Sequence, residues 1–587
     1  MSPFVSWVAH YSLQIIEGFI VLVSFIYLLA RVKPDKSLRC FHPLGRWFTD
    51  LSKSKTRAVV LVGLTVLCVR VALIPVLGIP QPGGQDEFSY LLAGDTFAHG
   101  RLANPTHPMW IHFETFHVNQ KPTYSSMYPP GQGLLLAGGE ILGHPWIGEL
   151  VATALVCSAI CWALQGWLPP MWALFGALLA VLRIGILGFW MNGYWASSLS
   201  GLGGALVLGA WPRLRKTLQL RYAVCLGLGL VILANVRPYE GFVFSLPFAF
   251  AMLLWLVGKR RPAFPLVLTR VVFPLFLILA LAAFGMGYYY WRVTGSPFQF
   301  AYHTNRSTYA QAQYFLWQRP APTPVYHHEI MRIYYEYELY YFNLIRTPWG
   351  YLVLNKLKAL LSWRFYIGPA LTLPLFALPW VFRDRRMRFP LIIAIVFLAG
   401  LAIETWGFPH YLAPAVALLY LIVAQCMRHL RLWNWRGKTL GVAWLRAIPM
   451  ICITMMVLRI VAAAEHQQIE YVWPPANHYR AEILGKLDHL DGQHLVLVRY
   501  LRNHNGDVEW VYNGADIDSA KVVWARDMGD AANRELLRYY KNRDVWMVDA
   551  DDSPPRLSVY SPALGPSNPG EMNTTVRSSP HSSPGIR

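Results

Sequence analysis

The stretch from Val271 to Trp291 reads VVFPLFLILALAAFGMGYYYW and contains no charged residue. It is as long as the roughly 20 apolar residues that an α-helix needs to cross the hydrocarbon core of a bilayer. Its last four residues are aromatic, and Tyr and Trp favour the interface between membrane and water. The stretch therefore predicts a membrane-spanning helix that ends at this interface.

Similar apolar blocks recur along the chain, which is 55% hydrophobic and only 14% charged. A soluble chain usually carries about 25% charged residues. The blocks predict about twelve spans, which are Tyr11–Ala30, Ala58–Leu77, Trp146–Leu164, Trp172–Phe189, Ser197–Ala210, Ala223–Val236, Val243–Val257, Val271–Trp291, Ile367–Val381, Leu391–Ile403, Leu412–Cys426 and Ile448–Ala463. The predicted fold class is an α-helical polytopic membrane protein with a small C-terminal α/β domain.

The net charge of +20 does not indicate nucleic-acid binding, because the basic residues cluster in short loops between the apolar blocks. These clusters lie within residues 31–57, 213–221, 259–261, 383–388 and 428–438. With the predicted spans they all fall on one side of the membrane, and an excess of Lys and Arg marks the cytoplasmic side. We therefore expect both termini and the large loops 78–145 and 292–366 on the outer side.

Four regions follow from this organisation. Residues 1–57 form an N-terminal span and a basic loop, and residues 58–464 form the multi-span region with its outward loops. Residues 465–552 are predicted to form the outward α/β domain, and the Ser-, Pro- and Gly-rich residues 553–587 a disordered tail. The predicted elements of the α/β domain are the strands His494–Tyr500, Lys521–Ala525 and Val545–Val548 and the helix Asn533–Tyr540.

An acidic pair, Asp86-Glu87, follows the second predicted span at the start of the first outward loop. On a helix, Asp86 and Tyr90 share a face at the i, i+4 spacing. A carboxylate at this place can remove the proton of an acceptor hydroxyl as a general base. The alternative is that the two acids only stabilise the N-terminus of a short surface helix.

Two cations are candidates for binding a phosphate. Arg237 lies at the outer end of the sixth predicted span, and Lys121 lies in the first outward loop. The planar guanidinium of Arg suits phosphate recognition. The alternatives are that Arg237 pairs with Glu240 or reaches lipid headgroups, and that Lys121 is solvated.

Further polar and aromatic residues lie in predicted outward turns. Asn192 occupies one of these turns, and Glu404, His410 and Tyr411 occupy another. We expect these residues to bind a substrate, because ionisable groups at a membrane boundary tend to be functional. An Asn-Gly turn and an interfacial aromatic belt are the alternatives.

The first outward loop also contains several possible metal ligands, namely His99, His107, His112, Glu114 and His117. No HExxH motif or close His pair occurs among them, so the sequence predicts no metal site, although a divalent metal stays possible. Neither a GxxxxGK[ST] nor a GxGxxG fingerprint is present.

The segment Asp86–Gly100 and the later Thr123-Tyr-Ser-Ser-Met-Tyr128-Pro-Pro-Gly-Gln-Gly133 together resemble the GT-C class of membrane glycosyltransferases. The resemblance is to bacterial family-39-like members, protein O-mannosyltransferases and aminoarabinose transferases. It implies Asp86 as catalytic base with Glu87 beside it, and a polyprenyl-phosphate sugar donor, which the lack of a nucleotide fingerprint fits better than a nucleotide sugar. Tyr90 and Tyr128, which lie in these two segments, are expected to bind the substrate. The extra N-terminal span departs from the class.

The predicted function is transfer of a hexose or pentose from a polyprenyl-phosphate donor to a hydroxyl of a lipid, glycan or protein of the cell envelope. The expected location is the outer face of a bacterial inner membrane, where membrane lipid surrounds the enzyme. The alternative is a lipid or glycan transporter or flippase. Transporters often carry related halves and midplane polar sites, whereas the polar candidates here gather at one membrane face.

Overall fold

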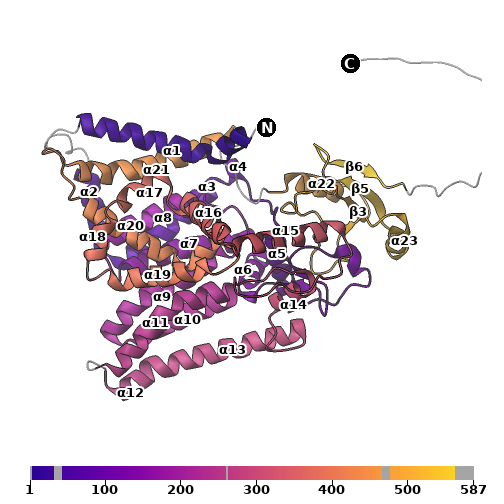
Figure 1. Ribbon diagram of the computed structural model, residues 1–587, viewed down its shortest axis with the longest axis horizontal. Helices are drawn as coiled ribbons and strands as arrows, with labels where there is room; N and C mark the ends of the chain where they lie inside the picture. Colours follow the sequence, from indigo (N-terminus) through magenta and orange to yellow (C-terminus); the bar gives the residue numbers. More distant parts are fainter. Residues whose placement is uncertain (1–2, 32–41, 259–261, 466–475, 562–587) are drawn as a thin grey trace, which may run out of the picture.

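The computed structural model describes residues 3–31, 42–258, 262–465 and 476–561. The segments 32–41 and 259–261, which belong to the basic clusters, lie outside the described residues. So does the predicted tail beyond residue 561. Figure 1 shows an elongated molecule with a helical bundle at one end and a small sheet domain at the other. The large loops 78–145 and 292–366, which are predicted to face outward and are here called the outward loops, lie between these two parts.

The bundle follows the apolar blocks of the sequence. Its principal helices are α1 (Pro3–Arg31), α3 (Lys55–Ala72), α7 (Trp146–Leu164), α8 (Pro170–Ala180), α9 (Ser197–Thr217), α10 (Leu220–Val236), α11 (Pro238–Val257), α13 (Phe273–Thr294), α19 (Arg388–Ala402), α20 (Val416–Leu430) and α21 (Leu440–Ala464). Six segments among the described residues are long and apolar enough to cross a membrane by length and composition. The protein is therefore an integral membrane protein, and the total of about twelve spans stays a prediction.

One predicted span, Ile367–Val381, is not a continuous helix. It is divided into α17 (Gly368–Leu375) and α18 (Leu378–Arg383). Pro374 lies inside the first piece and a second proline stands at the start of the next. Proline lacks the N–H that continues a helix, which accounts for the break.

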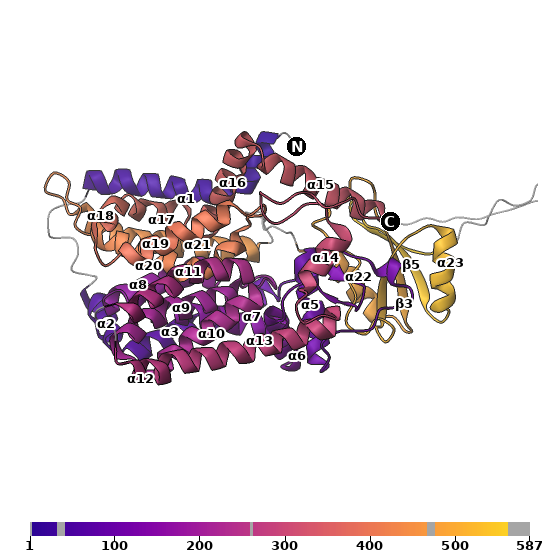
Figure 2. The ribbon, with the colours of Figure 1, turned by 60° about the horizontal axis from the view of Figure 1, so that its bottom comes forward.

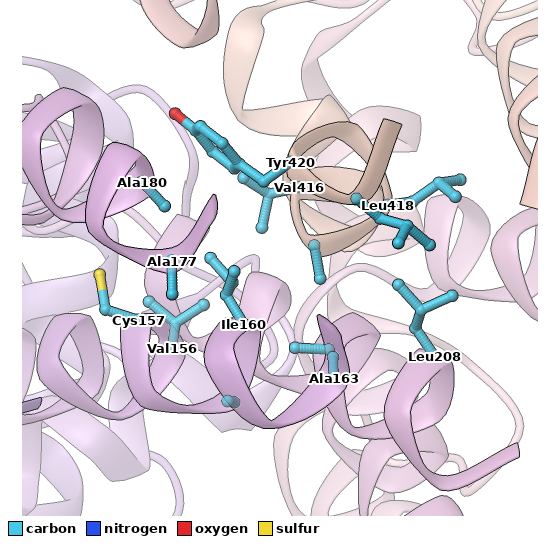
Figure 3. Packing of buried hydrophobic residues seen from close by; sticks show 14 of the residues in the cluster. Val156, Cys157, Ile160, Ala163, Ala177, Ala180, Leu208, Val416, Leu418 and Tyr420 are labelled. Atoms are coloured by element: carbon cyan, nitrogen blue, oxygen red, sulfur yellow. The ribbon is translucent and has the colours of Figure 1, made fainter. Parts of the chain in front are cut away.

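The core of the bundle is built on small side chains that let helices approach closely. Figure 3 shows this packing for residues of α7, α8, α9 and α20, including Ala163, Ala177 and Val416. Peripheral helices differ. In Figure 2, α1 and α13 lie at the edges of the bundle, and most residues of their apolar spans are not buried. Such faces suit contact with lipid tails.

The outward loops form a layer between the bundle and the sheet domain. The first loop contains α5 (Gln85–Ala98), α6 (Pro130–Ile141) and the paired strands β1 (Val118–Asn119) and β2 (Ser125–Ser126). The second contains α14 (Ala301–Tyr309), α15 (Glu329–Ile345) and α16 (Pro348–Tyr366). Both views place α5, α14 and α15 towards the sheet domain (Figures 1 and 2).

The C-terminal domain has a four-stranded sheet in the order β4-β3-β5-β6. Its elements are α22 (His478–Asp488), β3 (His494–Arg499), β4 (Val522–Arg526), α23 (Asp530–Tyr539), β5 (Asp544–Asp549) and β6 (Arg556–Val559). The central strand β3 pairs in parallel with β4 and β5, and β6 pairs antiparallel with β5. Because β6 lies beyond residue 552, the predicted start of the disordered tail is wrong and the domain extends further.

A buried polar junction joins this domain to the first outward loop. Arg526 Nε donates to the carbonyl oxygen of Glu114 over 2.5 Å, and its Nη2 lies 3.3 Å from Glu509 Oε2. The same Glu509 oxygen accepts a 2.6 Å hydrogen bond from Thr115 Oγ1. Arg526 and Glu509 are each only 2% exposed, so the domain is docked through charged groups removed from water.

Candidate active site

Asp86 lies in the first turn of α5, which begins after Gly84 in an extended conformation. Its carboxylate contacts two side chains, because Tyr128 donates its hydroxyl proton to Oδ1 and His117 Nδ1 faces the same oxygen. Burial acts to raise the pKa of Asp86, but the charge of His117 and the hydrogen bonds from His117 and Tyr128 outweigh it and lower the pKa to about 2. The group is therefore a fixed, ionised carboxylate at neutral pH.

The backbone of His117 is strained. Its φ is +58°, in the left-handed region that residues with a β-carbon rarely occupy. Ser89 Oγ donates to its carbonyl oxygen over 2.7 Å, and Met127 N donates to the same oxygen over 3.2 Å. Strain of this kind costs about 1–3 kcal/mol and persists where the surroundings fix it. The fold thus fixes the imidazole against Asp86.

Glu87 does not share the surroundings of Asp86. Its carboxylate accepts hydrogen bonds from the amides of Gly83, Gly84 and Tyr194 at 3.1, 3.3 and 2.9 Å. The side chain is buried, and burial raises its pKa to about 7 despite these three donors. Since Glu87 does not line the cavity next to Asp86, these contacts fit a positioning role better than the expected catalytic one.

Asp86 opens onto a cavity of about 570 Å³. The walls are largely aromatic and come from the outward loops, the turn before α20 and the C-terminal domain. Polar and charged lining residues are Gln85, Asp86, His117, Arg306, Glu338, Lys358, His504, Asn505 and Asp507. Arg306 and Glu338 are paired at 2.7 Å, so part of the charge is already neutralised within the wall.

The expected substrate-binding residues are placed at different depths. Tyr128 and Tyr411 line the cavity itself. Tyr90 stacks on Tyr128 with ring centroids 4.3 Å apart, and His410 stacks at 4.8 Å on Trp195, which also lines the cavity. Tyr90 and His410 therefore support wall residues from behind.

Arg237 is also one layer behind the wall. Its guanidinium lies 4.6 Å from the ring centroid of Tyr411, and its Nη1 lies 3.5 Å from Glu240 Oε1. Glu404 is buried and its carbonyl oxygen accepts a 2.7 Å hydrogen bond from Lys358 Nζ. Arg237 and Glu404 surround the site without lining the cavity.

Two other candidates lie away from the cavity. The Lys121 ammonium lies 4.2 Å from the ring centroid of Trp110. Asn192 accepts from Arg70 over 3.3 Å and donates to Gly188 O over 3.2 Å. Neither residue lines the cavity of Asp86, so the contacts favour the structural alternative for both.

A second cavity, of about 420 Å³, adjoins the first. Its lining is almost wholly apolar and comes mainly from α16, α19 and α20. Lys358, Gly407, Phe408 and Tyr411 line both cavities. The cavity next to Asp86 and the apolar cavity thus share a wall that carries the amine of Lys358.

Lys358 is a site residue that was not predicted from the sequence. Burial lowers its pKa to about 8, although the charge of Glu404 acts in the opposite direction. It lies on α16, within a segment expected to be an outward loop. The sequence gives no signal that separates Lys358 from Lys356, which stands in the same run Tyr351-Leu-Val-Leu-Asn-Lys-Leu-Lys-Ala-Leu-Leu361 and is exposed.

The possible metal ligands of the first loop do not form one group. His107 contacts Asp518 at 3.0 Å, His112 contacts the carbonyl oxygen of Arg526 at 3.2 Å, and Glu114 contacts His327 at 2.8 Å. Within the described ranges, a different set brings its ligand atoms within 4.8 Å of one another, namely Asp95, His99 and Glu140. None of these three lines the cavity of Asp86.

No family model and no curated protein matches the chain. Among solved structures it is similar to the apo oligosaccharyltransferase of Archaeoglobus fulgidus, with 14% identity and a TM-score of 0.47 over 86% of this chain and 70% of that one. It is also similar to ArnT from Cupriavidus metallidurans bound to undecaprenyl phosphate, with 13% identity and a TM-score of 0.48 over 84% of this chain and 93% of that one. Both neighbours are GT-C structures, the class that the sequence resembles. The likeness concerns the fold, so the function rests on this chain's own residues.

Proposed function

We propose that the protein is a GT-C glycosyltransferase that moves a sugar from a polyprenyl-phosphate donor to a hydroxyl acceptor at the outer face of a bacterial inner membrane. One observation carries the proposal. An ionised carboxylate, Asp86, opens onto a cavity with aromatic and charged walls, and this cavity shares a lysine-bearing wall with an almost wholly apolar one. This arrangement suits a substrate with an apolar tail and a phosphate between tail and sugar.

In the proposed reaction, the acceptor oxygen forms a bond to the anomeric carbon of the donor sugar while the bond from that carbon to the phosphate oxygen breaks. The phosphate leaves with the electron pair as polyprenyl phosphate. The acceptor proton passes to Asp86, whose other contacts, from His117 and Tyr128, keep it oriented. Because the low pKa of Asp86 makes it a weak base, orientation of the hydroxyl contributes alongside proton removal.

A positive charge stabilises the negative charge of the leaving phosphate, and this stabilisation is strong in a desolvated site. Lys358 is assigned this contact, because it lies where the apolar and polar cavities meet. Arg237 adds charge from behind Tyr411. Lys121, which lies over Trp110, has no part in the proposed step.

The outward orientation is supported by the distribution of Lys and Arg in the sequence, since the loop 78–145, which carries Asp86, contains only Arg101 and Lys121. The acceptor is an envelope lipid, glycan or protein. A donor that already lies in the membrane needs no nucleotide site.

The test is transfer of radiolabelled sugar from a panel of polyprenyl-phosphate sugars in native membranes that contain the wild type or Asp86→Asn. We expect the variant to lose about 10²–10⁴-fold in rate, the range associated with general acid–base groups. The matched control is Asp488→Asn, an exposed carboxylate on the C-terminal domain, which should transfer like the wild type. Undecaprenyl-phosphate-dependent thermal stabilisation of Asp86→Asn would show that it is folded. Full transfer by this variant would contradict the proposed role of Asp86.

A further inference from the structure

The C-terminal domain contributes one wall of the cavity that contains Asp86. The segment that does so is the loop after β3, residues 501–508, here called the 501–508 loop. Four consecutive residues of this loop, His504, Asn505, Gly506 and Asp507, line the cavity. The domain therefore takes part in the site and does not only pack beside it.

The 501–508 loop is fixed at both ends of its lining segment. Asp551 accepts a 2.8 Å hydrogen bond from Leu501 N, and its other oxygen lies 2.6 Å from His504 Nδ1. His504 Nε2 lies 3.0 Å from the carbonyl oxygen of Val508. A loop that is held in this way can present side chains at defined positions.

Close packing joins the loop to the surroundings of Asp86. A β-carbon added to Gly506 would come within 3.0 Å of the ring of Tyr334. The Tyr334 hydroxyl accepts a 3.1 Å hydrogen bond from Gln85, and its ring centroid lies 6.2 Å from that of His117. The loop is thus connected to the neighbours of Asp86 through Tyr334, which is separate from the Lys358 and Tyr411 side of the cavity.

Next to the loop, the lining contains a row of tyrosines on α15. Tyr334, Tyr337 and Tyr341 follow the i, i+3, i+7 spacing of one helix face, and all three line the cavity. Tyr341 stacks on Trp406 with ring centroids 5.2 Å apart, which makes a broad flat surface. The loop contributes the side chains of Asn505 and Asp507 to the same cavity, and Asn505 Oδ1 accepts a 3.1 Å hydrogen bond from Asp507 N.

This combination matches the chemistry of a carbohydrate. The C–H faces of a pyranose ring pack against flat aromatic rings, while its hydroxyls hydrogen-bond to amides and carboxylates. Pockets generally combine an apolar lining with a few convergent polar groups in this manner. We propose that the 501–508 loop and the tyrosine face of α15 form the acceptor subsite, and that the acceptor is a carbohydrate. This inference rests on the proposed glycosyltransferase function.

The test compares the wild type, the double variant Asn505→Ala/Asp507→Ala and the control Asn503→Ala, an exposed loop residue that does not line the cavity. Label from polyprenyl-phosphate sugars is followed into the endogenous acceptors of native membranes at increasing amounts of membrane. We expect the double variant to incorporate at least about 10-fold less at limiting acceptor, with a deficit that narrows as acceptor increases. Thermal stabilisation by undecaprenyl phosphate should equal that of the wild type, which separates loss of acceptor binding from misfolding.

Linkage analysis of the labelled product tests the class of acceptor. A sugar-to-sugar linkage is expected, whereas label on a protein side chain or directly on a lipid hydroxyl would overturn the carbohydrate assignment. Equal incorporation by the double variant and the wild type would overturn the acceptor subsite while leaving the proposed function intact. No incorporation by the wild type from any donor would overturn the proposed function, and this inference with it.

Discussion

At the scale of single residues, the contacts of Asp86 explain both its charge and its place. Burial acts to raise the pKa of Asp86, and the charge of His117 is the largest of the influences that lower this pKa. The strained φ of His117 and the hydrogen bond from Ser89 keep the imidazole in position. The Asp86 carboxylate is therefore ionised largely because it is paired with His117.

This pairing predicts a change in pH dependence for His117→Gln. In the wild type a pKa of about 2 keeps Asp86 ionised over roughly pH 5 to 9, so its titration should not limit transfer in this range. Without the imidazole, burial raises the pKa of Asp86, and the ionised fraction falls as the pH falls. We expect a new loss of rate on the acidic side in pH profiles of sugar transfer.

The control is Ser89→Ala, which leaves the imidazole present and should keep the acidic side of the profile flat even if the rate falls. A profile for His117→Gln with the shape of the wild-type profile would show that His117 does not set the ionisation of Asp86.

The sequence identified Asp86 as a candidate, and the structure places it in the lining of a cavity, while its catalytic role stays a prediction. It did not separate Asp86 from Glu87, because neighbouring residues on a helix point about 100° apart and only the fold shows which one meets the cavity. Lys358 was not predicted because its position matters only through two cavities, and many of the residues that line them are far from Lys358 in sequence. Three-dimensional proximity of this kind leaves little trace in a single chain.

At the scale of elements, the docking of the C-terminal domain depends on Arg526 at the end of β4. Arg526→Met should destabilise the protein by about 3–5 kcal/mol, because it leaves the buried carboxylate of Glu509 without its cation. Arg556→Met on β6 is the control, since its pair with Asp549 is exposed and worth about 0–1 kcal/mol. Thermal unfolding in detergent and limited proteolysis of the C-terminal domain measure the difference. Similar unfolding of the two variants would contradict the structural importance of the junction.

Most elements were predictable from local patterns. The runs rich in Val and Trp gave β3, β4 and β5 to within about two residues. The strand β6 was missed because Arg556-Leu-Ser-Val559 is short and follows prolines, and it becomes a strand only by pairing with β5. The break between α17 and α18 could have been read from the prolines of that segment.

At the scale of the whole molecule, the apolar cavity should hold the donor tail. Ala359 lines this cavity and is itself exposed at its rim, so a bulky residue can enter the cavity without disturbing the core. Ala359→Trp should weaken the thermal stabilisation by undecaprenyl phosphate by at least about 10-fold in concentration. Leu360→Trp is the matched control, because Leu360 is 41% exposed and does not line the cavity. Equal stabilisation of the two variants would place the tail elsewhere.

The two cavities share a wall that contains Lys358, and under the proposed function this shared wall has a kinetic consequence. The donor enters, and the spent lipid leaves, by moving sideways within one leaflet. The effective substrate concentration is then the mole fraction of donor in the surrounding lipid or detergent, not its amount per volume of solution. Adding empty micelles at constant total donor should slow the enzyme, as expected for catalysis confined to two dimensions.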